Sequence, residues 1–266
     1  MLSDKLRQFL VVFTVVSVLV MNYLSQSLPF GGQTNGQVSD KYHTDFTPAG
    51  FAFSIWGLIY LGLTAFAVYQ ALPSQRTNPR FRAVGPLVIL NGLLNCLWLP
   101  TFQNEYFLPS VLIILSMLFT AFGINLGLRL HKPLEPELAH HRVSDVPAAE
   151  KWIARAPFGL YFGWLTVASI ANVSVWLTAI GWDGWGLDTQ LWAQLLIVIG
   201  LFIGLFTFNR LRSFSYLIVF VWAFSAIAVE QQGNGSVSLV AGAAAVVAAI
   251  VWLVSLFRQS RVPATV

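Results

Sequence analysis

The sequence predicts an all-α integral membrane protein with about eight transmembrane helices. Its 266 residues are 56% apolar and only 10% charged, whereas soluble domains are about 25% charged. Several stretches of about 20 residues carry no charge, and this length crosses a hydrocarbon core about 30 Å thick. These stretches are apolar nearly all round, which disfavours a soluble protein built from amphipathic helices.

Eight uncharged segments are expected to form the helices, in this order: Phe9–Leu24, Gly50–Ala71, Ala83–Phe102, Phe107–Leu128, Pro157–Ala179, Leu191–Phe208, Phe214–Ala228 and Ser236–Phe257. The first follows Lys5 and Arg7, as a signal peptide would, but Met21–Ser25 lacks the small residues that signal peptidase prefers. We therefore expect it to remain as a helix. The seventh is the shortest. Two connections are long, Ser25–Ala49 and Arg129–Ala156, and the short ones make consecutive helices antiparallel neighbours.

Small residues at GxxxG spacing recur in the fourth, fifth, sixth and eighth segments. They are Gly123/Gly127, Gly159/Gly163, Gly200/Gly204 and Ala241/Ala245/Ala249. This spacing lets helix backbones approach closely within a bundle. It is equally compatible with a monomer and with a homodimer.

The basic residues support eight crossings, because eight helices place fourteen of the fifteen on one side. These are Lys5, Arg7, Arg76, Arg80, Arg82, Arg129, Lys132, Arg142, Lys151, Arg155, Arg210, Arg212, Arg258 and Arg261. Only Lys41 falls on the other side. The positive-inside rule then predicts that both termini are cytoplasmic. A helical protein is expected in a plasma or inner membrane, since bacterial outer-membrane proteins are usually barrels.

Three of the predicted helices carry polar and aromatic residues on one face. The second has Phe53, Trp56 and Tyr60; the third has Asn91, Asn95, Trp98 and Phe102; the fifth has Tyr161, Trp164, Asn172 and Trp176. A buried Asn is costly unless its amide is hydrogen-bonded, so these faces should point into the bundle. They suit a mostly apolar ligand pocket with a few orienting polar groups. They equally suit Asn residues that only join helices and Trp residues that only pack.

The same residues resemble the motifs of the TspO/MBR family (tryptophan-rich sensory proteins and the translocator protein). That family has Pro-Pro-x-Trp-Val-Phe before Trp-x-x-x-Tyr, and this chain has Pro48–Phe53 before Trp56–Tyr60. Its third helix ends Asn-x-x-Trp-x-Pro-x-Phe, which Asn95–Phe102 matches at every defined position. Its fifth helix has Tyr-x-x-Trp followed by Asn and Trp, as in Tyr161–Trp176.

The resemblance covers about residues 1–181 and departs from the family at several positions. Ala49 replaces the second Pro, Phe51 replaces the first Trp, and Leu160 stands in place of the fifth-helix Pro. The family core has five helices. We therefore expect a TspO-like bundle over 1–181 and a three-helix extension over 182–266.

By resemblance, the first five helices would enclose a pocket for a hydrophobic ligand, a porphyrin, haem or sterol. The expected ligand-binding residues are Pro48, Phe53, Trp56, Tyr60, Asn91, Asn95, Trp98, Phe102, Tyr161, Trp164 and Asn172. The protein would be a binding protein or sensor that needs no cofactor, with the lipid bilayer and the ligand as its partners and a homodimer as one possible state. No nucleic-acid partner is expected.

Two other function classes stay open. A facilitative transporter of a neutral or hydrophobic solute needs no coupling charge in the membrane, and the predicted helices contain none. An enzyme is disfavoured because no catalytic constellation is visible; light-dependent porphyrin breakdown, known in the family, is the one such activity retained. His43 as a haem ligand and the pair His140 and His141 as metal ligands are weaker alternatives.

Overall fold

The computed structural model describes residues 3–129 and 146–260, which fold almost entirely as helices without a strand. Eight helices in this part of the chain are long and apolar enough to cross a membrane, which confirms the predicted fold class. They are α1 (Asp4–Ser27), α3 (Ile55–Ala71) with the preceding 3₁₀ turn η1 (Gly50–Ser54), α4 (Pro79–Gln103), α5 (Phe107–Gly127), α7 (Ala156–Ala179), α8 (Thr189–Leu211), α9 (Phe214–Glu230) and α10 (Gly235–Ser260). Short elements join them: α2 (Asn35–Lys41), η2 (Pro73–Gln75), α6 (Ala148–Glu150), η4 (Lys151–Arg155), η5 (Gly184–Gly186) and η6 (Gln231–Gly233).

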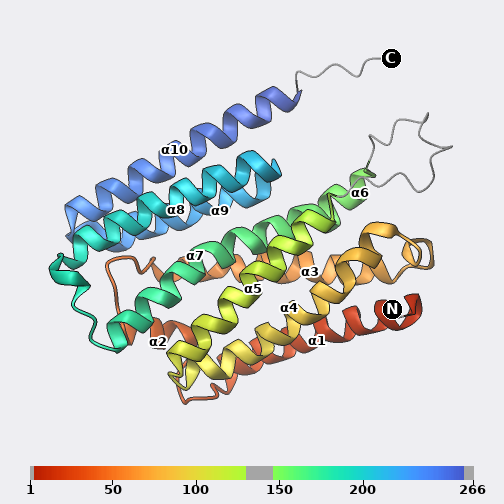
Figure 1. The fold of residues 1–266 in the computed structure, drawn as a ribbon, viewed down its shortest axis with the longest axis horizontal. Helices are drawn as coiled ribbons and strands as arrows, with labels where there is room; N and C mark the ends of the chain where they lie inside the picture. The colour runs from red at the N-terminus through yellow and green to blue at the C-terminus, as the bar shows by residue number, and fades with distance from the viewer. Residues whose placement is uncertain (1–2, 130–145, 261–266) are drawn as a thin grey trace.

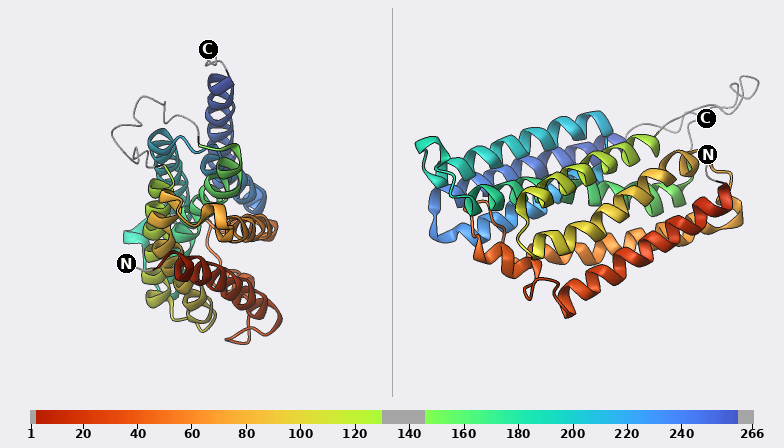
Figure 2. Two further views of the ribbon diagram at one scale, coloured as in Figure 1. Left: turned by 90° about the vertical axis from the view of Figure 1, so that its right-hand side faces the viewer. Right: turned by 60° about the horizontal axis from the view of Figure 1, so that its bottom comes forward.

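Five of the spanning helices form a closed ring. Each helix packs against the next in the order α1, α3, α7, α5, α4, and α4 returns to α1. Figure 1 shows these helices as the lower part of the molecule, and Figure 2 shows them from two further directions. The three helices with polar and aromatic faces, α3, α4 and α7, therefore belong to one ring.

The last three helices form a second layer on one side of the ring (Figure 1). α9 packs on α7 and is itself covered by α8 and α10. Two glycine pairs bring the backbones together there. A Cβ on Gly163 of α7 would lie 2.7 Å from the carbonyl oxygen of Tyr216, and one on Gly204 of α8 would lie 2.9 Å from the ring of Phe220. These GxxxG segments thus pack within the chain.

Basic side chains tie several helix ends together. Arg7 of α1 is 3% exposed and donates to the carbonyl oxygen of Arg76 at 2.8 Å. Arg82 of α4 pairs with Asp4, and Arg80 pairs with the buried Glu150. α1 begins and α10 ends at this same end of the bundle (Figures 1 and 2), as an even number of crossings requires. Lys132, Arg142 and Arg261, with His140 and His141, lie outside the described residues, and the cytoplasmic orientation stays a prediction.

The long connection between α1 and α3 contains the short helix α2, which we did not expect from the sequence. Thr34 caps it by accepting from Gln37 N, and the Gln37 side chain accepts from Thr34 N at 2.7 Å. This capping box is a recognisable Thr-x-x-Gln signal. Val38 of α2 is fully buried against Phe102 and Phe107, so the connection is packed onto the bundle.

Candidate ligand-binding site

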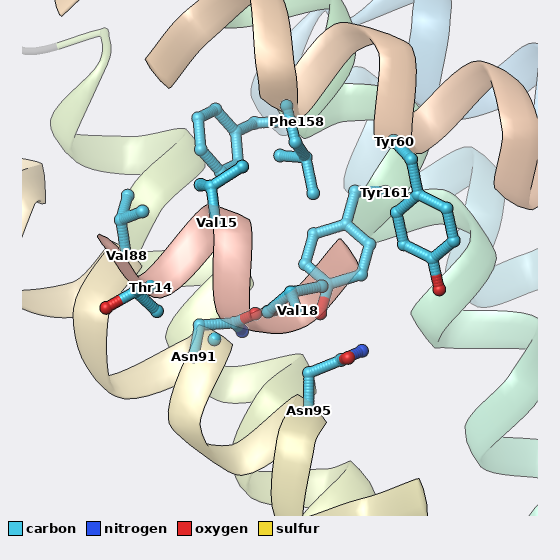
Figure 3. Close-up of a pocket in the computed structure, with 11 residues that line it drawn as sticks. Thr14, Val15, Val18, Tyr60, Val88, Asn91, Asn95, Phe158 and Tyr161 are labelled. Atoms are coloured by element: carbon cyan, nitrogen blue, oxygen red, sulfur yellow. Dashed lines mark hydrogen bonds between the residues drawn. The ribbon is translucent and has the colours of Figure 1, made fainter. Parts of the chain in front are cut away.

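The centre of the ring holds a small cavity lined by α1, α3, α4 and α7 (Figure 3). Its volume is about 20 Å³, enough for about one water molecule. Its polar lining comes from Tyr60, Asn91, Asn95 and Tyr161, all predicted as site residues. The remaining lining is mostly apolar, with Thr14 of α1 as a further polar residue. The closed ring thus has polar groups at its centre but no space for a large ligand.

An aromatic group fills the side of the ring next to this cavity. The Trp56 ring stacks on Tyr60 at 5.2 Å between centroids and lies 6.1 Å from Tyr161 and 6.2 Å from Trp164. Phe53 meets Trp164 edge-on at 5.9 Å. The predicted aromatic faces of α3 and α7 therefore do meet. Trp56 stands at their centre.

Asn91 joins three helices through hydrogen bonds. Its amide nitrogen donates to the carbonyl oxygen of Met117 and to Thr120 Oγ1 of α5, both at 2.8 Å. Its amide oxygen accepts from the Tyr161 hydroxyl at 2.7 Å, and Figure 3 shows the two side chains converging. Asn91 and Tyr161 are thus partners of each other, and this pair holds α4, α5 and α7 together.

Trp98 and Asn172 form a second pair, nearer the α2 end of the ring. The Trp98 indole donates to Asn172 Oδ1 at 2.9 Å, and the Asn172 amide donates to Ser110 Oγ of α5 at 2.9 Å. Trp98 also stacks on Phe102 at 4.9 Å. Phe102 in turn packs with Val38 of α2. These residues therefore join the ring to the segment between α1 and α3, which contains α2.

Asn95 lies between these two pairs and bonds to the first helix. Its amide oxygen accepts from Asn22 Nδ2 at 3.0 Å, and Asn22 also donates to the carbonyl oxygen of Val18. Asn22, Ser110 and Thr120 were not among the predicted site residues. They do not form a polar face like those of the predicted site helices, and only the packing of α1 and α5 on α4 and α7 brings them to the Asn residues.

Two of the predicted site residues carry a buried donor without a hydrogen-bond partner in the described part of the chain: Tyr60 at its hydroxyl and Trp164 at Nε1. Trp164 is only 3% exposed. A buried polar group without a partner is costly and marks a place where water or a ligand binds. Both side chains contact Trp56, so the residues that carry the two donors pack against one indole.

Pro48, the remaining predicted residue, lies away from the cavity in a segment held by the second layer. It is buried, and the next residue, Ala49, donates from its backbone to the carbonyl oxygen of Ala226 in α9 at 3.1 Å. Trp222 of α9 donates to the carbonyl oxygen of Ala52 at 3.0 Å and meets Phe51 edge-on. Phe51, which replaces a Trp of the family motif, thus packs against the second layer and not into the ring.

Glu105, in the turn between α4 and α5, binds three side chains of the segment that joins α1 to α3. It accepts from Lys41 at 2.5 Å, from the Tyr42 hydroxyl at 2.6 Å and from Gln33 at 2.5 Å. These three donors lower the pKa of Glu105 from 4.5 to about 2. The connection is therefore held by a charged contact from the acid range up to the alkaline pH at which Lys41 loses its proton.

Among the described residues, no three His, Cys, Asp or Glu side chains gather as a metal site would require. His43 is exposed and lies outside the ring cavity. The ring residues instead offer neutral hydrogen-bond donors and acceptors among aromatic walls, which suits an apolar ligand with a polar edge.

A comparison with family models matches residues 8–257 to the family described as TSPO-like protein. The matched residues extend from α1 into α10. No match was found among curated proteins or among solved structures. Because the family model spans most of the sequence, from the first helix of the ring into the last helix of the second layer, the chain belongs to the TSPO-like protein family.

Proposed function

We propose that this protein binds a tetrapyrrole or sterol-like molecule within the ring of α1, α3, α4, α5 and α7. The family indicates a membrane ligand-binding or sensor role in general. The observation that carries the finer proposal is the pair of unpartnered buried donors, Tyr60 Oη and Trp164 Nε1. Each would donate to the polar edge of the ligand, and Trp56, which packs against both side chains, would stack on its flat body.

The ligand needs more room than the closed ring offers, since the cavity holds only about 20 Å³. Trp56 and Tyr60 both belong to α3 and are half-buried. A Cβ added to Gly57, between them on α3, would meet no atom within 4 Å. We therefore assign the opening movement to α3, because an outward shift of this one helix would widen the space between its two rings and α7, with Trp56 and Tyr60 still lining the site. The shift would leave the Asn91–Tyr161 pair intact, since both of its residues belong to other helices.

The test is a titration of the purified full-length protein with protoporphyrin, followed by its absorbance shift, and with a sterol by displacement of the porphyrin. Tyr60→Phe and Trp164→Phe each remove one free donor. We expect each to weaken binding about tenfold, the loss that follows from one hydrogen bond of about 1.4 kcal/mol. Tyr69→Phe removes a hydroxyl from the same helix outside the cavity lining and should leave affinity unchanged. Equal affinity in wild type, Tyr60→Phe and Trp164→Phe would contradict the proposed site.

Facilitative transport is a second candidate, favoured by one observation. All residues that line the ring cavity are uncharged, as the passage of a neutral solute allows. Reconstituted protein in vesicles would then carry porphyrin or sterol at a rate that saturates with concentration. Saturable binding without such flux would support a binding protein or sensor.

A further inference from the structure

A second and much larger cavity lies between the ring and the second layer. Its volume is about 500 Å³, against about 20 Å³ at the ring centre. The end of α7, the turn that follows it, the beginning of α8 and the segment 43–46 before α3 form its walls. Figure 1 shows this turn at the end of the bundle opposite the beginning of α1. Cavities of 300–1,000 Å³ are typical of small-molecule sites.

Indole rings form one wall. Trp182 and Trp192 both line the cavity, and their ring centroids lie 5.0 Å apart. The Trp192 indole is fixed because it donates to the carbonyl oxygen of Gly184 at 2.7 Å. Gly184 has φ +65°, and a Cβ there would lie 2.9 Å from Trp192 Nε1. The turn therefore needs glycine at this position to hold the indole against the cavity.

Two carboxylates line the same cavity from two different connections, Asp45 from the segment between α2 and η1 and Asp183 from the turn between α7 and α8. Asp183 uses one oxygen to accept from the backbone of Trp185 at 2.9 Å, and the described residues provide neither carboxylate with an ion-pair partner. His43 is the one basic residue type in the lining, and Lys41 nearby in sequence is already bound to Glu105. The cavity thus has a negative charge beside a flat aromatic wall.

The remaining lining contains hydroxyl side chains and several apolar ones, with Phe46 and Leu177 on the ring side and Leu196 of α8 on the other. An ammonium group is attracted both by carboxylates and by the faces of indole rings. An apolar body attached to that ammonium would be buried against the leucines. We propose that this cavity is a second ligand site, separate from the ring centre, and that it takes an amphipathic organic cation. The site needs α8, so it assigns a role to the second layer, and it does not depend on the proposed function.

The test uses two ions of nearly the same size and opposite charge, tetraphenylphosphonium and tetraphenylborate, with the purified full-length protein in neutral detergent. We expect saturable binding of the cation and at least tenfold weaker binding of the anion. Replacing both carboxylates, in Asp45→Asn/Asp183→Asn, should weaken cation binding at least tenfold. Asp40→Asn removes the same charge from an exposed position on α2 outside the lining and should change affinity less than twofold.

Leu196→Trp provides a second variant that fills the cavity while keeping both carboxylates, and it should also abolish cation binding. Tyr60→Phe, at the ring centre, should leave it unchanged, which separates this site from the proposed ring site. Phosphatidylcholine that competes in bilayer discs would identify a lipid headgroup as the source of the ammonium; no competition would identify a free amine. Unchanged cation affinity in the double variant, or equal binding of the anion, would overturn the proposal.

Discussion

The two tyrosines of the ring cavity allow a sharp test, because they have the same side chain but different partners. Tyr161 is buried and donates to Asn91 Oδ1 at 2.7 Å, whereas the Tyr60 hydroxyl has no partner in the described part of the chain. Each Tyr→Phe change removes one hydroxyl from the same cavity. Only Tyr161→Phe breaks a hydrogen bond and leaves an acceptor of Asn91 unpaired.

The expected loss follows from hydrogen bonds between membrane helices, which average about 0.6 kcal/mol and reach about 1.7 kcal/mol. The Tyr161 bond is short and buried, and the orphaned Asn91 oxygen adds a desolvation cost. We therefore expect Tyr161→Phe to lower the free energy of unfolding by about 1–1.5 kcal/mol. Tyr60→Phe should change it by less than about 0.5 kcal/mol, since no bond is lost.

Unfolding in mixed micelles of denaturing and mild detergent, followed by near-UV circular dichroism, measures both differences without ligand. A loss for Tyr60→Phe equal to or larger than that for Tyr161→Phe would refute the assignment of partners. In that case the free donor of the ring would not be Tyr60, and the proposed ligand contact would fall with it.

Two further predictions concern packing and pH. Gly163→Ala should lower the free energy of unfolding by about 1–3 kcal/mol, because its Cβ would lie 2.7 Å from the carbonyl oxygen of Tyr216. Gly57→Ala meets open space and should not destabilise the protein. Equal unfolding midpoints of the two variants would contradict the close contact of α7 and α9. Since the pKa of Glu105 is lowered from 4.5 to about 2, its contact with Lys41 stabilises the fold fully above about pH 4.5 and loses this effect as the pH falls towards 2. The difference in unfolding temperature between wild type and Glu105→Gln should therefore be largest near neutral pH and shrink as the pH falls from 4.5 towards 2. A difference that is the same at pH 7 and at pH 2 would contradict this prediction.

Most of the fold could be predicted because a helix that crosses a lipid bilayer needs a long uncharged, apolar stretch of sequence. The segment predicted at Phe107–Leu128 forms Phe107–Gly127, and Gly50–Ala71 forms η1 and α3 as expected. The short helix α2 was not predicted because it lacks the long apolar stretch of a membrane-spanning helix. Its capping box is the sequence signal that marks it. Helix order within the ring could not be predicted from hydropathy, since every helix has enough apolar surface to pack against any other.

The residues that face the ring could be predicted from helical periodicity, but their hydrogen-bonded pairs could not, and their role in ligand binding stays a prediction. Periodicity placed Trp56, Tyr60 and Trp164 on inward faces, and the structure brings their rings together. It could not show that Trp98 bonds to Asn172, or that Tyr161 bonds to Asn91, because such pairs depend on the depth of one helix relative to another. The large cavity could not be predicted either, because Asp45 and Asp183 are far apart in the sequence and only the packing of the helices brings them together.

The position of α9 has a consequence for how the chain is made. In the final structure 56% of its most apolar 18-residue window is buried, against 28% for α8 and for α10. α10 is synthesised after α9, so α9 must first reside in lipid with its future contact surface uncovered. Its surface towards α10 has to suit two environments in succession, first acyl chains and then the packed side chains of α10. Insertion and packing are thus separate requirements on the same residues, and a change that preserves the hydropathy of α9 can still prevent its assembly.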